Sequence, residues 1–179
     1  MTTISAAATA MTGASRRTPA IRGALLLLFG LCETALLLVA FRLPDVTASV
    51  LVVIMVGFLL LDGLTIVFEV AGAMARRRRR LLRIGEAIVS IGAGVVIALA
   101  ARGHALSVFA WWALLTGLLD LAEARAVRHR GTRLFIAVCS IVFGALLLWA
   151  AGGDLPVRVL GAGIYGIIVG ALKLRAAVH

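Results

Sequence analysis

The sequence has few charged residues and very few acidic ones. Only 15% of its 179 residues are charged, and just eight are aspartate or glutamate. Ordinary soluble domains contain about 25% charged residues. The chain therefore lacks the polar groups that a water-exposed surface needs, and we expect lipid to solvate much of its exterior.

The residues that most often build reactive or metal-binding sites are also scarce. The two cysteines, Cys32 and Cys139, lie inside apolar runs and have neither metal-ligand spacing nor a disulfide framework, so we interpret them as small buried hydrophobic residues. The three histidines lie between apolar runs or at the terminus, which argues against zinc or haem. No nucleotide-binding glycine fingerprint, GxSxG elbow or metalloprotease motif is present. We expect no cofactor, no metal and no enzymatic activity.

Apolar residues, in contrast, are abundant: 63% of the chain is hydrophobic and the mean hydropathy is +1.12. They form six runs, each close to the roughly 20 residues that a helix needs to cross the hydrocarbon core. These runs lack the period-two alternation of a barrel strand, so helices are the expected spanning form. The runs cover residues 23–41, 48–72, 81–101, 105–122, 134–151 and 157–172. We predict an all-α membrane protein whose six transmembrane helices occupy residues 22–179, after a disordered tail at 1–21.

The basic residues indicate the orientation in the membrane. Fifteen of the eighteen lie in the tail, in the second and fourth breaks between runs, or near the C-terminus. Only Arg42, Arg102 and Arg158 fall on the other side. The positive-inside rule therefore predicts that both termini are cytoplasmic.

The net charge of +10 is interpreted in the same way, as a topology signal and a means of lipid contact rather than as a nucleic-acid surface. Anionic headgroups are the expected partners of the five consecutive arginines Arg76, Arg77, Arg78, Arg79 and Arg80.

The six runs also resemble three copies of one helical hairpin, at about residues 22–76, 80–128 and 133–177. A shift of 50 residues aligns Ser90 with Ser140, a shift of 58 aligns Asp62 with Asp120, and a shift of 107 aligns Gly63 with Gly170. Small residues spaced four apart let helices approach closely in lipid. The residues predicted to pack helices in this way are Ser90, Gly94, Ser140, Gly144, Gly166 and Gly170. Contact between copies of the chain is the alternative role.

Two carboxyl groups, Glu33 and Asp62, fall near the middle of their apolar runs. An acidic residue at the bilayer centre costs about 2.5–3.5 kcal/mol, so neither should face lipid. They are the candidate intramembrane polar site, either as a protonatable pair along a polar path or as carboxyls bonded across helices. No lysine or arginine is expected beside them at that depth.

The other acidic residues of the runs lie closer to the cytoplasmic side, where arginines are available. We predict ion pairs there among Glu69, Arg83, Glu86, Asp120, Glu123 and Arg125. At the opposite side, Trp149, Trp111 and Trp112 suit the outer interface of the membrane.

Taken together, these patterns resemble a known family. The turn "LPD" (43–45) and the helix ends "LLLDGLTIVFEVAGAMARR" (59–77) and "GIYGIIVGALKLRAA" (163–177) are similar to the HdeD-like acid-resistance membrane proteins. The resemblance covers residues 22–177, although the middle unit has Asp120-Leu121 where the first has Asp62-Gly63. It implies a bacterial inner-membrane protein linked to survival of acid stress, without defined catalytic residues.

Three hypotheses for function follow. The first is a non-enzymatic stress protein of the HdeD-like type, which acts through packing, lipid contact or partner binding. The second is a proton-coupled transporter or channel that uses Glu33 and Asp62. The third is an accessory subunit that stabilises a larger membrane complex.

Overall fold

The computed structural model describes residues 20–37, 43–72, 77–99, 104–124, 130–150 and 155–178, and no strand occurs among them. Six helices are long and apolar enough to cross a membrane, which confirms the predicted all-α membrane fold. They are a first helix, Ala20–Leu37, followed by α2 (Pro44–Gly72), α3 (Arg77–Leu99), α4 (Ala105–Ala124), α5 (Arg130–Trp149) and α6 (Leu155–Val178).

Most helices begin or end a few residues away from the predicted apolar runs. The first helix already includes Ala20, so the predicted end of the tail at residue 21 is wrong, while residues 1–19 lie outside the described part. The last helix continues to Val178 rather than ending at 172, and it therefore carries Lys173 and Arg175. The starts of α2 and α6 follow local chemistry, because Pro44 and Pro156 occupy first-turn positions where proline costs no hydrogen bond.

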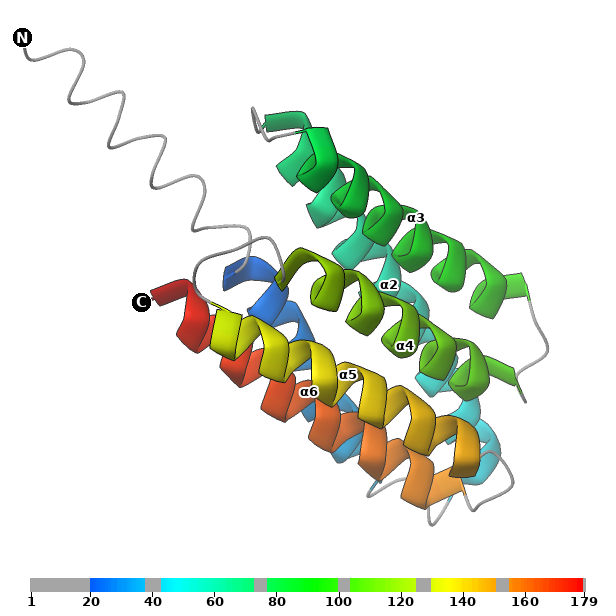
Figure 1. Ribbon diagram of the computed structural model, residues 1–179. Coiled ribbons are helices and arrows are strands. Elements are labelled where there is room, and N and C mark those ends of the chain that lie inside the picture. Colours follow the sequence, from blue (N-terminus) through cyan, green and yellow to red (C-terminus); the bar gives the residue numbers. More distant parts are fainter. Residues whose placement is uncertain are drawn as a thin grey trace, which may run out of the picture.

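The helices form an antiparallel bundle in which the start of the first helix and the end of α6 lie at the same end (Figure 1). We call this the charged end, because Arg22, Arg83 and Arg133 all lie there. The most extensive contacts join α2 to α3 and α4 to α5, while α3 with α4 and α5 with α6 touch less. The first helix packs against α6. The closest pairs are thus shifted by one helix from the hairpins expected from the sequence.

Glycines mark where these three pairs approach most closely. A Cβ atom added at any of three glycines would meet one backbone carbonyl and, one turn later, one backbone N–H of the partner helix. The contacts are Gly63 with Ala87 and Ile91, Gly117 with Ala137 and Ile141, and Gly170 with Gly23 and Leu27.

These contacts establish which positions are equivalent in the three pairs. Gly63, Gly117 and Gly170 correspond, at spacings of 54 and 53 residues, and the overall shift of 107 agrees with one sequence overlay. The overlay by 58 residues is wrong, because in this register Asp62 corresponds to Thr116 rather than to Asp120. Composition misled that overlay, since leucines flank both acidic residues.

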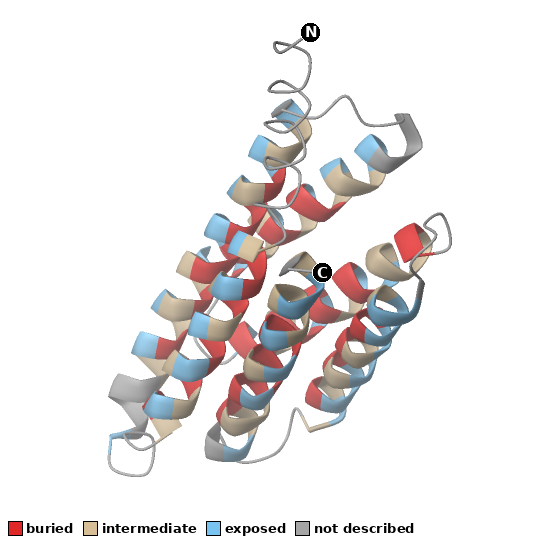
Figure 2. Cartoon of the chain, turned by 90° about the vertical axis from the view of Figure 1, so that its left-hand side faces the viewer, coloured by how far each residue is buried: buried red, intermediate tan, exposed pale blue. Residues whose placement is uncertain are grey.

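The pattern of buried and exposed residues agrees with this helix arrangement. Buried residues face the inside and exposed ones the outside along each helix (Figure 2), and many exposed residues are large and apolar, including Leu99 at 83% and Trp149 at 87%. Such a surface suits lipid. Trp112 was expected near the outer interface, but that prediction is wrong, because its side chain is only 4% exposed.

The centre of the bundle is filled by aromatic rings from five helices. Phe29 lies 4.7 Å from Phe58 and 5.2 Å from Phe109, measured between ring centroids, and stacked contacts join Phe109 to Trp112 and Phe143 to Tyr165. We call this group the aromatic layer; it consists of Phe29, Phe58, Phe109, Trp112, Phe143 and Tyr165. It closes the interior below the charged end.

The contact between the first helix and α6 is a testable feature of this packing. A Cβ atom at Gly30 would lie 2.5 Å from the Ile167 nitrogen and 2.6 Å from the Gly163 oxygen, both backbone atoms that cannot move aside alone. We expect Gly30→Ala to lower the free energy of unfolding by about 1–3 kcal/mol, the usual cost of overpacking. Unfolding in mixed detergent micelles, followed by circular dichroism, measures it.

Gly57 is the matched control, since it is also helical and a Cβ there would meet nothing within 4 Å. Gly57→Ala should leave stability unchanged or raise it by up to about 1 kcal/mol through helix propensity. Equal effects of the two substitutions would contradict the close contact.

Candidate functional site

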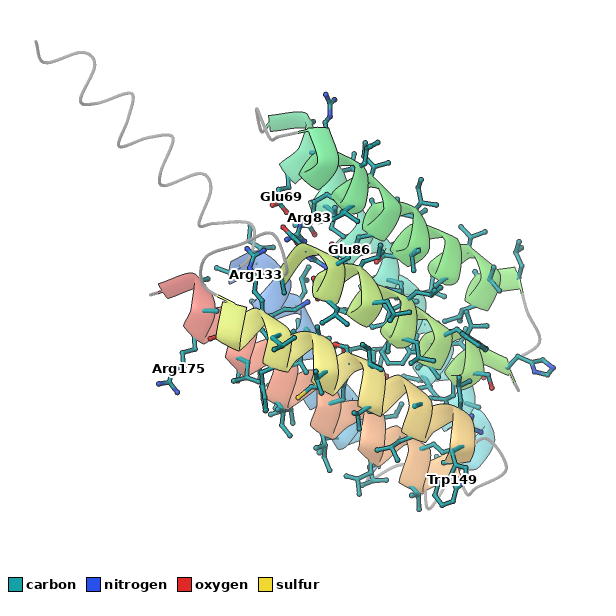
Figure 3. All side chains as sticks on the ribbon, viewed as in Figure 1. Glu69, Arg83, Glu86, Arg133, Trp149 and Arg175 are labelled. Carbon is teal, nitrogen blue, oxygen red and sulfur yellow. The ribbon has the colours of Figure 1, made fainter. Side chains whose placement is uncertain are left out.

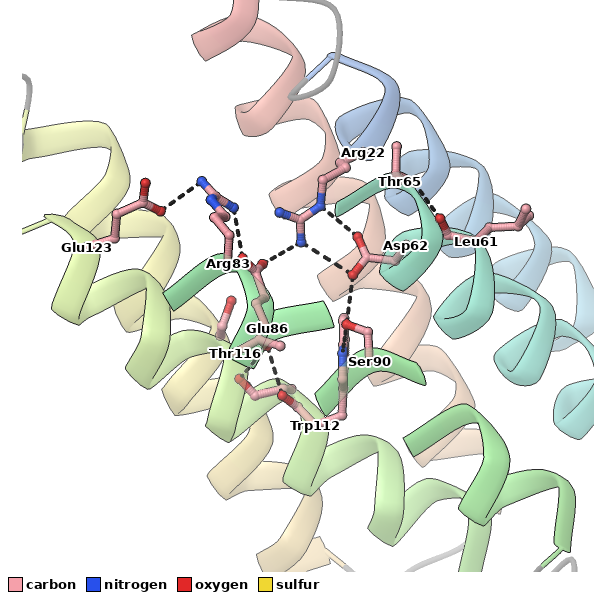
Figure 4. A network of polar contacts seen from close by, with 12 residues as sticks. Arg22, Leu61, Asp62, Thr65, Arg83, Glu86, Ser90, Trp112, Thr116 and Glu123 are labelled. Atoms are coloured by element: carbon pink, nitrogen blue, oxygen red, sulfur yellow. Dashed lines mark hydrogen bonds and ion pairs between the residues drawn. The ribbon is translucent and has the colours of Figure 1, made fainter. Parts of the chain in front are cut away.

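A buried arginine lies at the centre of the most distinctive polar group in the bundle. Arg22 comes from the first turns of the first helix, and its residue is only 6% exposed. Its Nε donates to Asp62 Oδ1 at 2.8 Å and its Nη2 donates to Glu86 Oε1 at 2.5 Å. One guanidinium thereby ties the first helix to α2 and α3 (Figure 4).

The pairing continues from Glu86 towards α5. Arg83 donates to Glu86 Oε2 at 2.8 Å and pairs with Glu123 of α4 at 2.7 Å. Arg133 of α5 pairs with the other oxygen of Glu123 at 3.0 Å. Because positive and negative groups alternate, each of these buried carboxylates meets at least one arginine.

On the other side of Arg22 the pairing ends in neutral groups. Ser90 donates its hydroxyl to Asp62 Oδ2 at 2.9 Å, and the Trp112 indole donates to Ser90 at the same distance. Trp112 also belongs to the aromatic layer. We call the whole series the charge chain; it runs through Trp112, Ser90, Asp62, Arg22, Glu86, Arg83, Glu123 and Arg133, and it links five helices. Figure 4 shows the series from Trp112 to Glu123.

A cavity of about 140 Å³ adjoins the charge chain at the charged end. Ala176, exposed on the last turns of α6, lies at its edge. Five helices contribute to its lining, which combines charged side chains with a largely apolar surface: Arg22, Arg83, Asp120, Arg133, Ile136 and Lys173.

Glu33 lies elsewhere. It is eleven residues beyond Arg22 on the first helix, roughly 16 Å at 1.5 Å per residue, and Phe29 of the aromatic layer stands between them. Its residue is 0% exposed, and neither carboxyl oxygen has a hydrogen-bond partner among the residues that the structure describes.

The structure separates the two members of the candidate intramembrane site. Asp62 belongs to the charge chain and Glu33 does not, so they form no common polar path. The expectation that no basic residue would lie near Asp62 is wrong. Arg22 reaches it because a long side chain in the first turns of one helix can extend inward to its neighbour.

The residues predicted to form ion pairs at the cytoplasmic side have different positions. Arg83, Glu86 and Glu123 pair in the charge chain, and Glu69 lies beside Arg83, with which it interacts electrostatically (Figure 3). Asp120 lines the cavity. Arg125 and Arg76 lie outside the described residues, as do the side chains of Arg77, Arg78 and Arg79.

The residues predicted to pack helices lie at helix contacts. Gly94 and Gly144 face α2 and α4, and Gly166 and Gly170 face the first helix. The two serines also have polar roles: Ser90 bonds Asp62, and Ser140 shares a hydrogen bond of 2.9 Å with the Tyr165 hydroxyl.

Four members of this polar region were absent from the predicted site: Arg22, Arg133, Lys173 and Trp112. A signal for Arg22 did exist in the sequence. Arg22, Leu26, Phe29 and Glu33 are spaced as one face of a helix, and all four are buried. The arginine had instead been grouped with the charges of the tail.

Comparison with known proteins gives one family. The family described as "Short repeat of unknown function (DUF308)" matches residues 21–99 and 105–149, which include the first helix and α2 to α5. No curated protein and no solved structure matches the chain.

The role of Arg22 can be tested by substitution. We expect Arg22→Met to lower the free energy of unfolding by about 3–5 kcal/mol, because Asp62 loses its arginine while Glu86 keeps only Arg83. Detergent titration of the purified chain, followed by loss of helical signal, measures the change. The matched control is Arg175→Gln, an exposed arginine of α6, which should change stability little.

A compensated variant separates charge from packing. Arg22→Met combined with Asp62→Asn and Glu86→Gln leaves no unpaired acid around the former guanidinium, so we expect much of the lost stability to return. A single Arg22→Met variant as stable as the parent would contradict the burial and pairing described above.

Proposed function

Because the chain belongs to the DUF308 short-repeat family, we propose that it is a non-enzymatic bacterial inner-membrane protein of the HdeD-like type that supports survival of acid stress. It acts through its packed helices, its lipid contacts or a membrane-protein partner. The family match and the resemblance of residues 22–177 support this proposal. The observation that carries it is the charge chain.

The charge chain fits a structural role better than a reactive one. Asp62, Glu86 and Glu123 are each 3% exposed or less, and each is held by arginine. Carboxylates bonded in this way tie helices together and are not presented to a substrate. Their pairing across five helices stabilises one arrangement of the bundle.

The position of these groups also suits a protein exposed to external acid. Acid unfolds proteins mainly by protonating carboxylates that are paired in the folded state. With the predicted orientation, the charge chain faces the cytoplasm. The breaks between apolar runs on the outer side contain only two carboxyls, Asp45 and Asp154, and one histidine, His104. On the outer side of the membrane, therefore, few side chains would change their charge when the external pH falls.

Survival of acid challenge tests this function. We expect deletion of the gene to lower survival after transfer to strongly acidic medium, and a plasmid copy to restore it. Growth at neutral pH serves as the control and should be unaffected. Equal survival of the deletion and parent strains at every pH would refute the acid-stress role.

A second candidate function rests on Glu33 alone. A buried carboxyl without a partner is costly, and an ionisable residue inside a membrane is by default a functional-site hypothesis. Glu33 meets both conditions among the described residues. A proton-coupled transporter would take up and release a proton at this group, so this activity is the alternative to the structural role.

Proton flux in liposomes tests the alternative. If Glu33 carries protons, the reconstituted chain should acidify the lumen faster than protein-free vesicles, and Glu33→Gln should remove at least about nine-tenths of that difference, since the amide cannot exchange a proton. Glu69→Gln, at the charged end, is the matched control and should retain the flux. A flux that survives Glu33→Gln would exclude this mechanism.

A further inference from the structure

The cavity at the charged end is lined by groups of both charge signs, and the functions discussed above assign it no ligand. Its volume of about 140 Å³ is several times the ~30 Å³ that one water molecule occupies. It is well below the ~300–1,000 Å³ of pockets for drug-sized ligands. The occupant is therefore a small group rather than a large solute.

Two of the cations that line the cavity are already paired with carboxylates of the charge chain. Arg22 is bound by Asp62 and Glu86, and Arg83 by Glu86 and Glu123. Arg83 still has a buried Nε without a hydrogen-bond partner in the described part of the chain. These two guanidiniums form a polar side of the cavity, and the carboxylates paired with them balance most of their positive charge.

The two remaining charges, Asp120 on α4 and Lys173 on α6, attract each other electrostatically, and Arg22 and Arg83 also attract Asp120. Asp120 and Lys173 both line the cavity, and within the described ranges neither makes a hydrogen bond or a close ion pair. Arg133 has one contact, to Glu123, and its side chain is 37% exposed. The lining of the cavity thus includes a carboxylate and an ammonium that attract each other without a direct ion pair among the described residues, and a guanidinium that is paired with Glu123.

The overall charge balance selects the kind of ligand. Among the described residues the cluster contains four cations, Arg22, Arg83, Arg133 and Lys173, and five carboxylates, Asp62, Glu69, Glu86, Asp120 and Glu123. A simple anion would add to this negative excess, which is unfavourable away from water. A zwitterion leaves the balance unchanged and can meet both Asp120 and Lys173.

We propose that this cavity binds a phosphoethanolamine group. Its phosphate lies against Lys173 and Arg133, and its primary ammonium donates to Asp120. These residues lie within about five positions of the ends of their membrane spans, Ala105–Ala124, Gly131–Trp149 and Val157–Ala177, the depth at which lipid headgroups occur. The headgroup of phosphatidylethanolamine is the source that the location favours. The inference does not depend on the acid-stress proposal.

Native mass spectrometry of the full chain, purified in mild detergent, tests the proposal. The protein is titrated with phosphatidylethanolamine, phosphatidylcholine and phosphatidylglycerol of identical acyl chains. We expect the first lipid to bind about tenfold more tightly than either of the others, as one charge-assisted contact implies. Choline cannot donate a hydrogen bond to Asp120, and glycerol carries no cation.

Substitutions test which residue binds the ammonium of the headgroup and which binds its phosphate. Asp120→Asn should remove the preference for ethanolamine over choline, and Asp120→Glu should retain it. Lys173→Gln should weaken phosphatidylethanolamine binding about tenfold. Arg175→Gln, an exposed cation two residues away on the same helix, should bind like the parent. Circular dichroism melts establish that each variant is folded.

Soluble phosphoethanolamine distinguishes the two sources of this group. Binding of the lipid without measurable binding of the soluble compound supports the headgroup, whereas the reverse supports the same site with a soluble ligand. Equal binding of the three lipids, tighter binding of phosphatidylglycerol, or an unchanged preference in folded Asp120→Asn would overturn the proposal.

Discussion

The arrangement of the whole charged end depends on one buried ion group, Arg22 with Asp62 and Glu86. An unpaired aspartate at the centre of a membrane span costs about 2.5–3.5 kcal/mol on insertion scales, and Asp62 lies near the middle of its apolar run. Here the guanidinium donates to two carboxylates from two other helices. The cost of each charge is offset only while the first helix, α2 and α3 stay together. The group therefore specifies a helix arrangement that apolar packing in lipid would leave less defined.

The equivalence of the three helix pairs explains why the charges are not symmetric. In the register of the glycine contacts, Arg22, Glu86 and Ile136 occupy corresponding positions, as do Asp62, Thr116 and Val169. At these positions two of the pairs thus carry charges, while the third pair has Thr116 and Ile136. Ile136 is shorter than arginine or glutamate, and it lines the cavity. The cavity lies where the third copy of the repeat lacks a long polar side chain.

Much of the fold could be predicted from the sequence, because only helices of about 20 apolar residues satisfy the backbone within a bilayer. Helix pairing could not be predicted, since lipid-facing and core-facing residues are both apolar here and periodicity carries little information about burial. Leu99 and Leu59 show this, as one is 83% exposed and the other 0%. Arg22 was missed for a related reason: a basic residue at the edge of a span is usually a topology signal, and only its contacts show that it turns inward.

The polar contacts and the glycine contacts depend on each other. Ser90 has a short side chain, and its bond to Asp62 requires α2 and α3 to approach closely at that level. Gly63, next to Asp62, permits this approach, because a Cβ there would lie within about 3.3 Å of the Ala87 oxygen and the Ile91 nitrogen. In lipid, close packing of small residues drives helix association without a hydrophobic contribution from water. The small residues thus set the spacing, and at that spacing Ser90 and Arg22 can satisfy an aspartate that the membrane would otherwise exclude.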